Sequence, residues 1–218
     1  MPDLIDTLVG IEPGSRLDAL RAKRPVARAD AQATYDGLVT APADLTRASA
    51  VERVAIAYWV AALSRAAVLA EHYAGLLARL DPAVRAALDA VLGAPARAGT
   101  GAPGASVAST GPSDVLTPTT TGPYGSYPPG PLSAEDEDGL HWVAPDALRT
   151  SVGDRLTAAL EHAHLLTYRP RDASPDALQA LLDAGWSLDG VVTVSQLVAF
   201  THFQLRVVAG LTVLKEVR

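Results

Sequence analysis

The chain has 218 residues, with 18 Lys and Arg against 24 Asp and Glu, which gives a formal net charge of −6 and a pI of about 5.3. Because no basic stripe is available to neutralise a phosphate backbone, the sequence predicts no nucleic-acid partner. Cysteine is absent, which excludes disulfides, thiolate metal sites and thiol nucleophiles.

The composition favours helices. Hydrophobic residues make up 49% of the chain but aromatic residues only 5%, so Ala, Leu and Val must fill the interior. Ala and Leu are strong helix formers, and no stretch alternates β-branched residues as a sheet would. We therefore predict an all-α protein. The first residues lack the basic region of a secretory signal, and no window reaches about 18 apolar residues, so we also predict a cytoplasmic protein without a membrane segment.

Residues 1–44 are typical of an N-terminal arm of short helices, with a turn at Glu12-Pro13-Gly14. Residues 45–92 form a first helical block. In it, Ser49 and Glu52 match a capping box, which predicts one long helix continuing to about Arg79. A second helix then begins at Asp81-Pro82, because proline is favourable at the first helical position, and ends near Gly93.

The composition changes sharply in the middle of the chain. From Gly93 to Ser133 it is dominated by Gly, Pro, Ser, Thr and Ala, and a short acidic run follows at Glu135 to Asp138. This segment cannot bury enough apolar surface to offset the entropy of ordering, so we predict a flexible insertion over residues 93–144. The alternative is a lid or a partner-wrapping arm. Four consecutive acids cannot converge on one ion from a helix face, so we expect no metal site there.

Residues 145–218 are predicted to form a second helical block. A helix opens at Pro145 and runs to about Tyr168, and another is capped by Ser174. Gly185 ends that helix and Ser187 begins a final helix that reaches the C-terminus. Apolar residues recur along this last helix at helical spacing, which is typical of a core or subunit-interface helix.

Two segments carry a resemblance to known proteins: Gly185 to Arg206, GWSLDGVVTVSQLVAFTHFQLR, and Glu52 to Leu77, with HYAGLL beginning at His72. The first is similar to the closing helix, and the second to the first long helix, of the carboxymuconolactone decarboxylase and AhpD-like alkylhydroperoxidase superfamily. The resemblance covers residues 45–80 and 155–214 and implies one AhpD-like helical domain that carries the long insertion.

In AhpD-like peroxidases the first long helix carries Cys-x-x-Cys-x-x-x-His with an upstream glutamate, and the Glu and His move protons for the two thiols. Anchored on His72, the cysteine positions fall at Arg65 and Val68, and the glutamate falls near Glu52. The resemblance therefore implies His72 and Glu52 as proton-transfer residues, without thiol peroxidase activity. Where relatives often have Asn, this chain has His202.

The residues around His72 are candidates for binding. On one continuous helix, Tyr58, Arg65 and His72 are seven residues apart and would share a face with Val68. The Arg65 guanidinium suits a carboxylate, and its alternative role is a salt bridge between helices or subunits. His72 is either a proton-transfer residue or a structural histidine.

Three further residues, Glu52, Ser64 and His202, are candidates for the site. Glu52 also serves the predicted capping box. Ser64 is a candidate nucleophile for which no base is identifiable. His202 either faces the pocket or packs between helices. His162 and His164 are two residues apart, so they point in different directions on a helix and cannot share a metal.

Two functions follow from this reading. The first is a homo-oligomeric protein that binds a small carboxylate or lactone or transforms it by acid/base chemistry, with no cofactor. Here His72 moves the proton, while Arg65 holds the anion. The second is a non-catalytic oligomeric scaffold, or a partner of a cysteine-bearing relative. The sequence leaves open whether the protein is an enzyme.

Overall fold

The computed structural model describes residues 3–93 and 142–217, and all regular elements within these ranges are helices, which confirms the all-α prediction. The predicted insertion lies almost wholly outside the described residues, as does the acidic run. The helices are α1 (Leu4–Val9), α2 (Arg16–Ala22), α3 (Pro25–Tyr35), the π-helix η1 (Asp36–Thr40), α4 (Ala50–Leu63), α5 (Ala67–Leu80), α6 (Pro82–Leu92), α7 (Asp146–Tyr168), the 3-10 helix η4 (Pro170–Asp172), α8 (Pro175–Asp183) and α9 (Leu188–Glu216).

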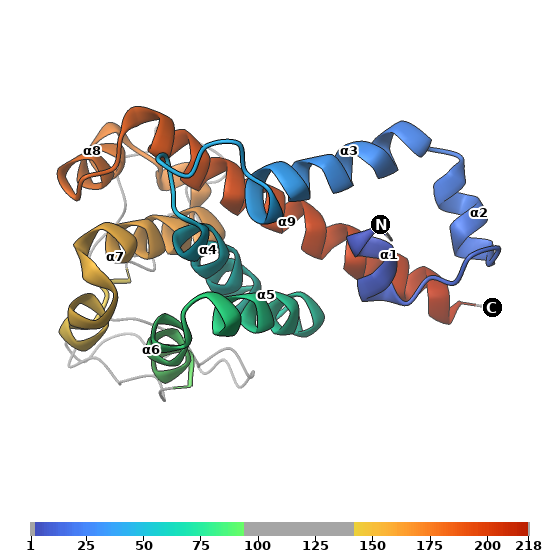
Figure 1. The fold of residues 1–218 in the computed structure, drawn as a ribbon, viewed down its shortest axis with the longest axis horizontal. Coiled ribbons are helices and arrows are strands. Elements are labelled where there is room, and N and C mark those ends of the chain that lie inside the picture. Colours follow the sequence, from blue (N-terminus) through green and yellow to red (C-terminus); the bar gives the residue numbers. More distant parts are fainter. Residues whose placement is uncertain (1–2, 94–141, 218) are drawn as a thin grey trace, which may run out of the picture.

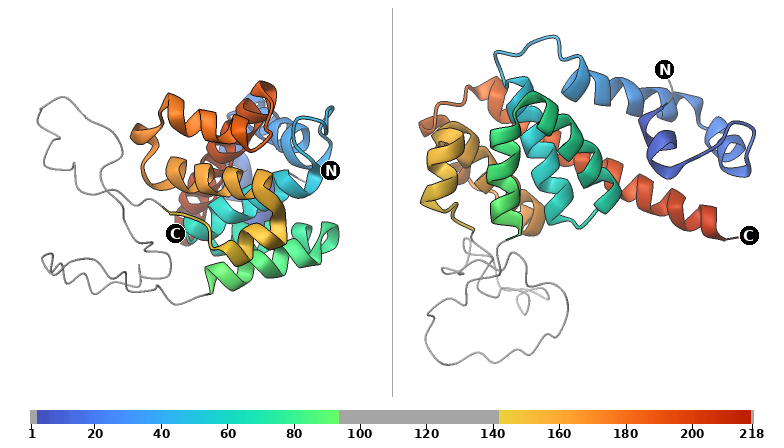
Figure 2. Two further views of the ribbon diagram at one scale, coloured as in Figure 1. Left: turned by 90° about the vertical axis from the view of Figure 1, so that its left-hand side faces the viewer. Right: turned by 60° about the horizontal axis from the view of Figure 1, so that its bottom comes forward.

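Helix α9 runs the length of the molecule (Figure 1). Helices α4–α8 gather around its N-terminal half, and α1–α3 lie beside its C-terminal half (Figures 1 and 2). One large hydrophobic cluster fills the first region, and a small cluster of Ile5, Val9, Ala31, Val208 and Leu211 holds the second. At 29 residues α9 is also long and apolar enough to cross a membrane by length and composition, although in this fold it contributes to both clusters.

Helix α4 is the centre of the large cluster. Nearly every residue from Arg53 to Leu63 is buried, and the helix contacts α5, α6, α7 and α9. Trp59 is fully buried, donates a hydrogen bond to the Leu160 carbonyl at 3.1 Å and packs against Trp142. The predicted capping box is confirmed, since the Ser49 hydroxyl accepts from the Glu52 amide and the Glu52 carboxylate accepts from the Ser49 amide.

The prediction of one continuous helix from residue 49 to residue 79 is wrong. Helix α4 ends at Leu63 in a Schellman motif, in which the Ala66 amide bonds the Ala61 carbonyl and the Arg65 amide bonds the Ala62 carbonyl, both at 3.0 Å. Arg65 therefore has a left-handed backbone, with φ of 54°. Sequence reasoning missed this end because the position is normally occupied by glycine, as at Gly10 and Gly185.

The serine caps predicted elsewhere are confirmed, since Ser174 caps α8 and Ser187 caps α9 through their side-chain oxygens. Helix α6 begins at Pro82 as predicted, and the Asp81 side chain caps it. Helix α7 extends to Tyr168 as predicted but is kinked at Gly153, whose φ is 81°.

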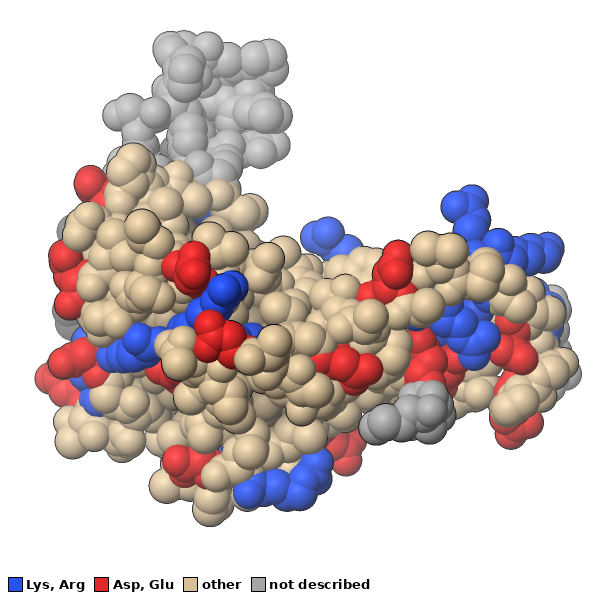
Figure 3. Space-filling model, turned by 45° about the horizontal axis from the view of Figure 1, so that its top comes forward, with Lys and Arg blue, Asp and Glu red and all other residues tan. Residues whose placement is uncertain are grey.

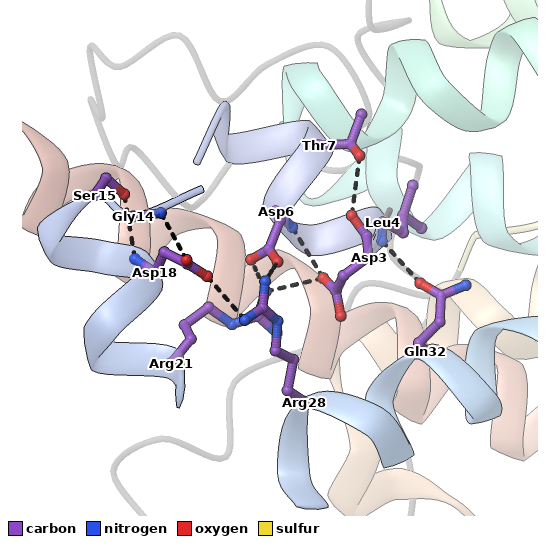
Figure 4. A network of polar contacts seen from close by, with 10 residues as sticks. All are labelled: Asp3, Leu4, Asp6, Thr7, Gly14, Ser15, Asp18, Arg21, Arg28 and Gln32. Carbon is purple, nitrogen blue, oxygen red and sulfur yellow. Dashed lines mark hydrogen bonds and ion pairs between the residues drawn. The ribbon is translucent and has the colours of Figure 1, made fainter. Parts of the chain in front are cut away.

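The region of α1–α3 is joined by a polar network (Figure 4). The buried Asp6 carboxylate accepts from both Arg21 and Arg28, and Arg28 also bonds Asp18 at 2.9 Å. Asp3 accepts from Arg21 at 2.9 Å. The network links α1, α2 and α3, so it fixes the geometry of the predicted N-terminal arm.

This region is also attached to the end of α9. Arg16 donates to the carbonyls of Leu214 and Val217, and Lys215 donates to the carbonyls of Val9 and Gly10. The C-termini of α9 and α1 thus each receive a cation that satisfies their free carbonyls. Figure 3 shows basic side chains gathered at this end of the molecule, where Lys23 and Arg24 are exposed, while acidic and basic side chains are mixed elsewhere on this face.

Two glycines of α9 should respond oppositely to alanine. A Cβ at Gly190 would lie 2.8 Å from the Arg47 carbonyl oxygen and 2.9 Å from Cε3 of Trp186, whereas a Cβ at Gly210 meets nothing within 4 Å. We expect Gly190→Ala to lower the free energy of unfolding by about 1–3 kcal/mol through overpacking. Gly210→Ala should raise it by about 0.5–1 kcal/mol, because alanine loses less entropy in a helix. Urea denaturation measures both, and similar effects at the two positions would contradict the close packing of Gly190.

Candidate functional site

His72 lies on α5, within reach of the C-terminal end of α3. Its Nε2 is 2.8 Å from the hydroxyl of Tyr35, the last residue of α3. The side chain is half-buried, and burial, followed by the positive charge of Arg79, lowers the pKa of His72 from its ordinary value of 6.5. The imidazole is therefore neutral at pH 7.

Tyr35 has the matching protonation state. Burial, followed by the negative charge of Asp36, raises the pKa of Tyr35 to about 12, against a smaller lowering by Arg79. The phenol is therefore protonated at pH 7 and can donate to Nε2 of His72. When it does, Nδ1 of the imidazole carries the proton and is the ring atom left to face a ligand.

Arg79 belongs to the same face of α5 as His72. Val68, His72, Gly75 and Arg79 follow one another at spacings of four, three and four residues, so they line one side of the helix, which we call the α5 face. Val68 and Arg79 are exposed, and His72 and Gly75 are half-buried. The guanidinium of Arg79 extends back over Gly75, where Nη1 lies 3.8 Å from the position a Cβ would take.

Below the α5 face, a second tyrosine ties α5 to α9. The Tyr73 hydroxyl, fully buried, donates to Oε1 of the buried Gln204. Tyr73 also packs edge-on against the His72 ring, with centroids 5.2 Å apart. The imidazole is thus held between two phenols, one from α3 and one from its own helix.

Arg65 precedes the α5 face in the turn after α4. Its side chain is exposed, and its charge acts on Tyr168, whose hydroxyl donates to the Leu63 carbonyl at 3.1 Å. The neighbouring Ser64 hydroxyl oxygen is buried and has no hydrogen-bond partner within the described ranges. Val68 lies one turn before His72 on α5, whereas Arg65 lies in the turn between α4 and α5, where its charge acts on Tyr168.

The remaining predicted site residues are placed elsewhere. Tyr58 does not share a helix face with His72: it is buried against α6, where its hydroxyl donates to Asp89 at 2.5 Å and Arg85 covers its ring. The prediction of a common face is wrong because the helix breaks between the two residues. Burial, followed by the bond to Asp89, raises the pKa of Tyr58 to about 12.

Glu52 lies at the start of α4, where its carboxylate already has two partners. Besides its bond to the Ser49 amide, it pairs with Nε of Arg155 at 2.7 Å. No hydrogen bond or ion pair joins Glu52 to His72 in the described structure, and Tyr35 is the direct partner of the imidazole instead.

His202 packs between α9 and α7. Its Nε2 is 3.4 Å from the Thr167 hydroxyl, and burial, followed by the charge of Arg206, lowers the pKa of His202. His162 and His164 are both buried in α7, and His164 stacks on Trp142. Across residues 3–93 and 142–217, no three His, Asp or Glu side chains are grouped to hold a metal ion.

Sequence reasoning missed Tyr35, Gly75 and Arg79. The positions of Gly75 and Arg79 relative to His72 could have been found, because spacings of three and seven residues place side chains on one helix face. Tyr35 could not, since its contact with His72 joins residues 37 apart on separate helices. Comparisons with protein-family models, with curated proteins and with solved structures found no match for the chain.

The left-handed backbone of Arg65 should be strained, and this strain can be measured. A left-handed backbone costs a non-glycine residue about 1–2 kcal/mol, and such strain is often kept where a side chain has a function. We expect Arg65→Gly to raise the free energy of unfolding by about 1 kcal/mol. Ala66→Gly is the matched control, because φ of Ala66 is −82° and glycine gains nothing there. An equal or lower stability for Arg65→Gly would show that the turn is not strained.

Proposed function

We propose that the chain is a cysteine-less relative of the carboxymuconolactone decarboxylase and AhpD-like proteins that binds a small carboxylate or lactone at the α5 face. The observation that supports this most is the pairing of neutral His72 with protonated Tyr35 beside Arg79, whose charge acts on both. A guanidinium next to a neutral imidazole suits an anion that also accepts or gives a proton. Arg79 takes the anion-holding role first given to Arg65, which lies in the turn before α5.

In this proposal each residue has one task. Arg79 orients the carboxylate, and Tyr35 holds the His72 ring by donating to Nε2. His72 donates from Nδ1 to the ligand, and it accepts a proton only when the ring turns or the Tyr35 bond is exchanged. Glu52 has no role at the reacting atoms, because its carboxylate is committed to the α4 cap and to Arg155.

The test follows the His72 ring by NMR while benzoate, succinate or γ-butyrolactone is added. A bound anion favours the imidazolium, so benzoate or succinate should raise the pKa of His72 towards or above its ordinary value. Arg79→Gln should abolish this response, and Arg47→Gln, an exposed arginine on the loop before α4, should preserve it. No response at His72 to any of the three probes, or a full response in Arg79→Gln, would contradict the proposal.

The same samples separate an enzyme from a binder. Conversion of the lactone or carboxylate, detected in the ligand signals and lost in His72→Gln, supports acid/base catalysis. A His72 response without conversion supports a binding protein.

The second candidate is an oligomeric scaffold, and one observation favours it. Helix α9 exposes apolar side chains along its length, including Val192, Phe203 and Val213, which are 55%, 44% and 59% exposed. Such a surface is typical of an interface. We propose that this surface serves self-association, and a cysteine-bearing relative is the alternative partner. We also propose that the protein is cytoplasmic.

A further inference from the structure

The exposed side of α9 follows a regular heptad pattern. Its members are spaced alternately three and four residues apart, all are exposed, and we call them the α9 stripe: Asp189, Val192, Gln196, Ala199, Phe203, Arg206, Gly210 and Val213. A mean spacing of 3.5 residues is the pattern that keeps one seam of a helix against a second helix in a coiled coil. The residues between them supply the buried side of α9, so the stripe is separate from the packing within the chain.

The stripe carries two charges of opposite sign. From Gly190 to Leu214, Arg206 is the only residue among Lys, Arg, Asp and Glu, and Asp189 comes directly before this segment. Arg206 has no ion pair within the described ranges. The side chain of Asp189 is 70% exposed and has only a 3.7 Å contact with the exposed Arg47. Both charges can therefore take a further partner at little cost.

A single two-fold axis matches the stripe to itself. If the axis passes midway between Leu197 and Val198, antiparallel α9 helices bring Asp189 of one copy to Arg206 of the other, and the reverse. The same operation places Val192 against Phe203 and Gln196 against Ala199. Charged residues meet opposite charges, large apolar residues meet each other, and small Ala199 lets the helices approach near the axis.

We propose that two copies of the chain associate through the α9 stripes as an antiparallel, two-fold symmetric pair. This inference rests on the scaffold candidate and gives its interface. It does not depend on ligand binding at the α5 face. The overlap covers residues 189–206, about 26 Å of helix at 1.5 Å per residue, so the pair is small and dissociates on dilution.

Charge exchange tests the pairing. Sedimentation velocity over a wide concentration series should show a monomer–dimer equilibrium for the unaltered chain. Arg206→Asp and Asp189→Arg should each weaken association by about tenfold or more, because each places like charges opposite one another. The double variant, with both charges exchanged, should recover the original association. A monomer at every concentration, or single variants that associate as tightly as the unaltered chain, would overturn the proposal.

Engineered cysteines test the direction of the pair, and the absence of native cysteine makes each one a unique probe. When Val192→Cys and Phe203→Cys chains of different tag length are mixed and mildly oxidised, the mixed disulfide should dominate over either self-pair, because position 203 and its own symmetry copy lie about 16 Å apart along the helix. Val213→Cys, which lies on the stripe but outside the overlap, should give no disulfide with Val192→Cys. Dominant self-pairing of Phe203→Cys would indicate a parallel pair and overturn the antiparallel arrangement.

Ligand binding at the α5 face and dimerisation through the α9 stripe can be tested independently. Asp189 lies at the N-terminal end of α9, whereas α5 contacts α9 near Gln204 through Tyr73. The His72 response to benzoate should therefore be unchanged in Asp189→Arg even where dimerisation is lost. Normal dimerisation with no His72 response would leave the interface standing and remove the ligand site.

Discussion

Replacing Arg53 by alanine should lower the free energy of unfolding by about 3–5 kcal/mol, because it removes a buried charged donor. Arg53 is 3% exposed, and its guanidinium donates to three backbone carbonyls, those of Ala48 at 2.8 Å, Leu38 at 3.0 Å and Asp44 at 2.9 Å. These bonds attach η1 and the following loop to α4. Alanine leaves the carbonyls without a donor and opens a cavity beside them.

Urea denaturation followed by circular dichroism measures this loss. Arg47→Ala is the matched control, because Arg47 is exposed and makes only surface ion pairs, so its removal should cost less than about 1 kcal/mol. Arg53→Lys should recover little, since an ammonium cannot reproduce the three directions of the guanidinium. Comparable losses for Arg53→Ala and Arg47→Ala would show that the three carbonyl bonds do not hold the loop.

Replacing Asp6 by alanine should release α1–α3 from their common arrangement. Its buried carboxylate lies between Arg21 and Arg28 (Figure 4), and removing it leaves two guanidinium groups facing each other without their shared anion. Breaking a buried ion pair by removing one partner costs about 3–5 kcal/mol. Because the cluster that holds these helices to α9 is small, the cost should appear mainly as local opening.

Hydrogen exchange read by mass spectrometry locates that opening. Backbone amides of α1–α3 should lose protection, and those of α4 should keep it. Asp6→Asn separates charge from volume, and Asp30→Ala, an exposed acid on α3, should change neither region. Loss of protection spread equally over α4 and α9 would show instead that the molecule opens as one unit.

Much of this fold could be predicted from local chemistry. Ser49, Asp81, Ser174 and Ser187 each cap a helix, since a side-chain oxygen followed by an apolar period is a local signal. The break at Arg65 could not, because the chain there has neither glycine nor proline. Arg65 nevertheless has a left-handed backbone, which is unfavourable for a residue other than glycine.

The candidate site also has residues that could be predicted from the sequence and residues that could not. His72, identified by resemblance, and Val68 both lie on the α5 face, whereas Arg65 lies in the turn before α5. The predicted acid/base partner Glu52 is tied to Arg155, a contact between residues 103 apart, and Tyr35 meets His72 from another helix. Contacts of this kind depend on how helices pack, which periodicity along a single segment does not encode.

The attachment of α1–α3 to the end of α9 sets the order in which the chain can fold as it is synthesised. Arg16 and its acceptor Leu214 are 198 residues apart, so the first helices leave the ribosome long before their partner exists. Until then Ile5 and Val9 have no apolar surface of α9 to cover them. Docking of these helices is therefore a late step with a long loop to close, and nascent chains halted before α9 should expose this region to proteases or chaperones.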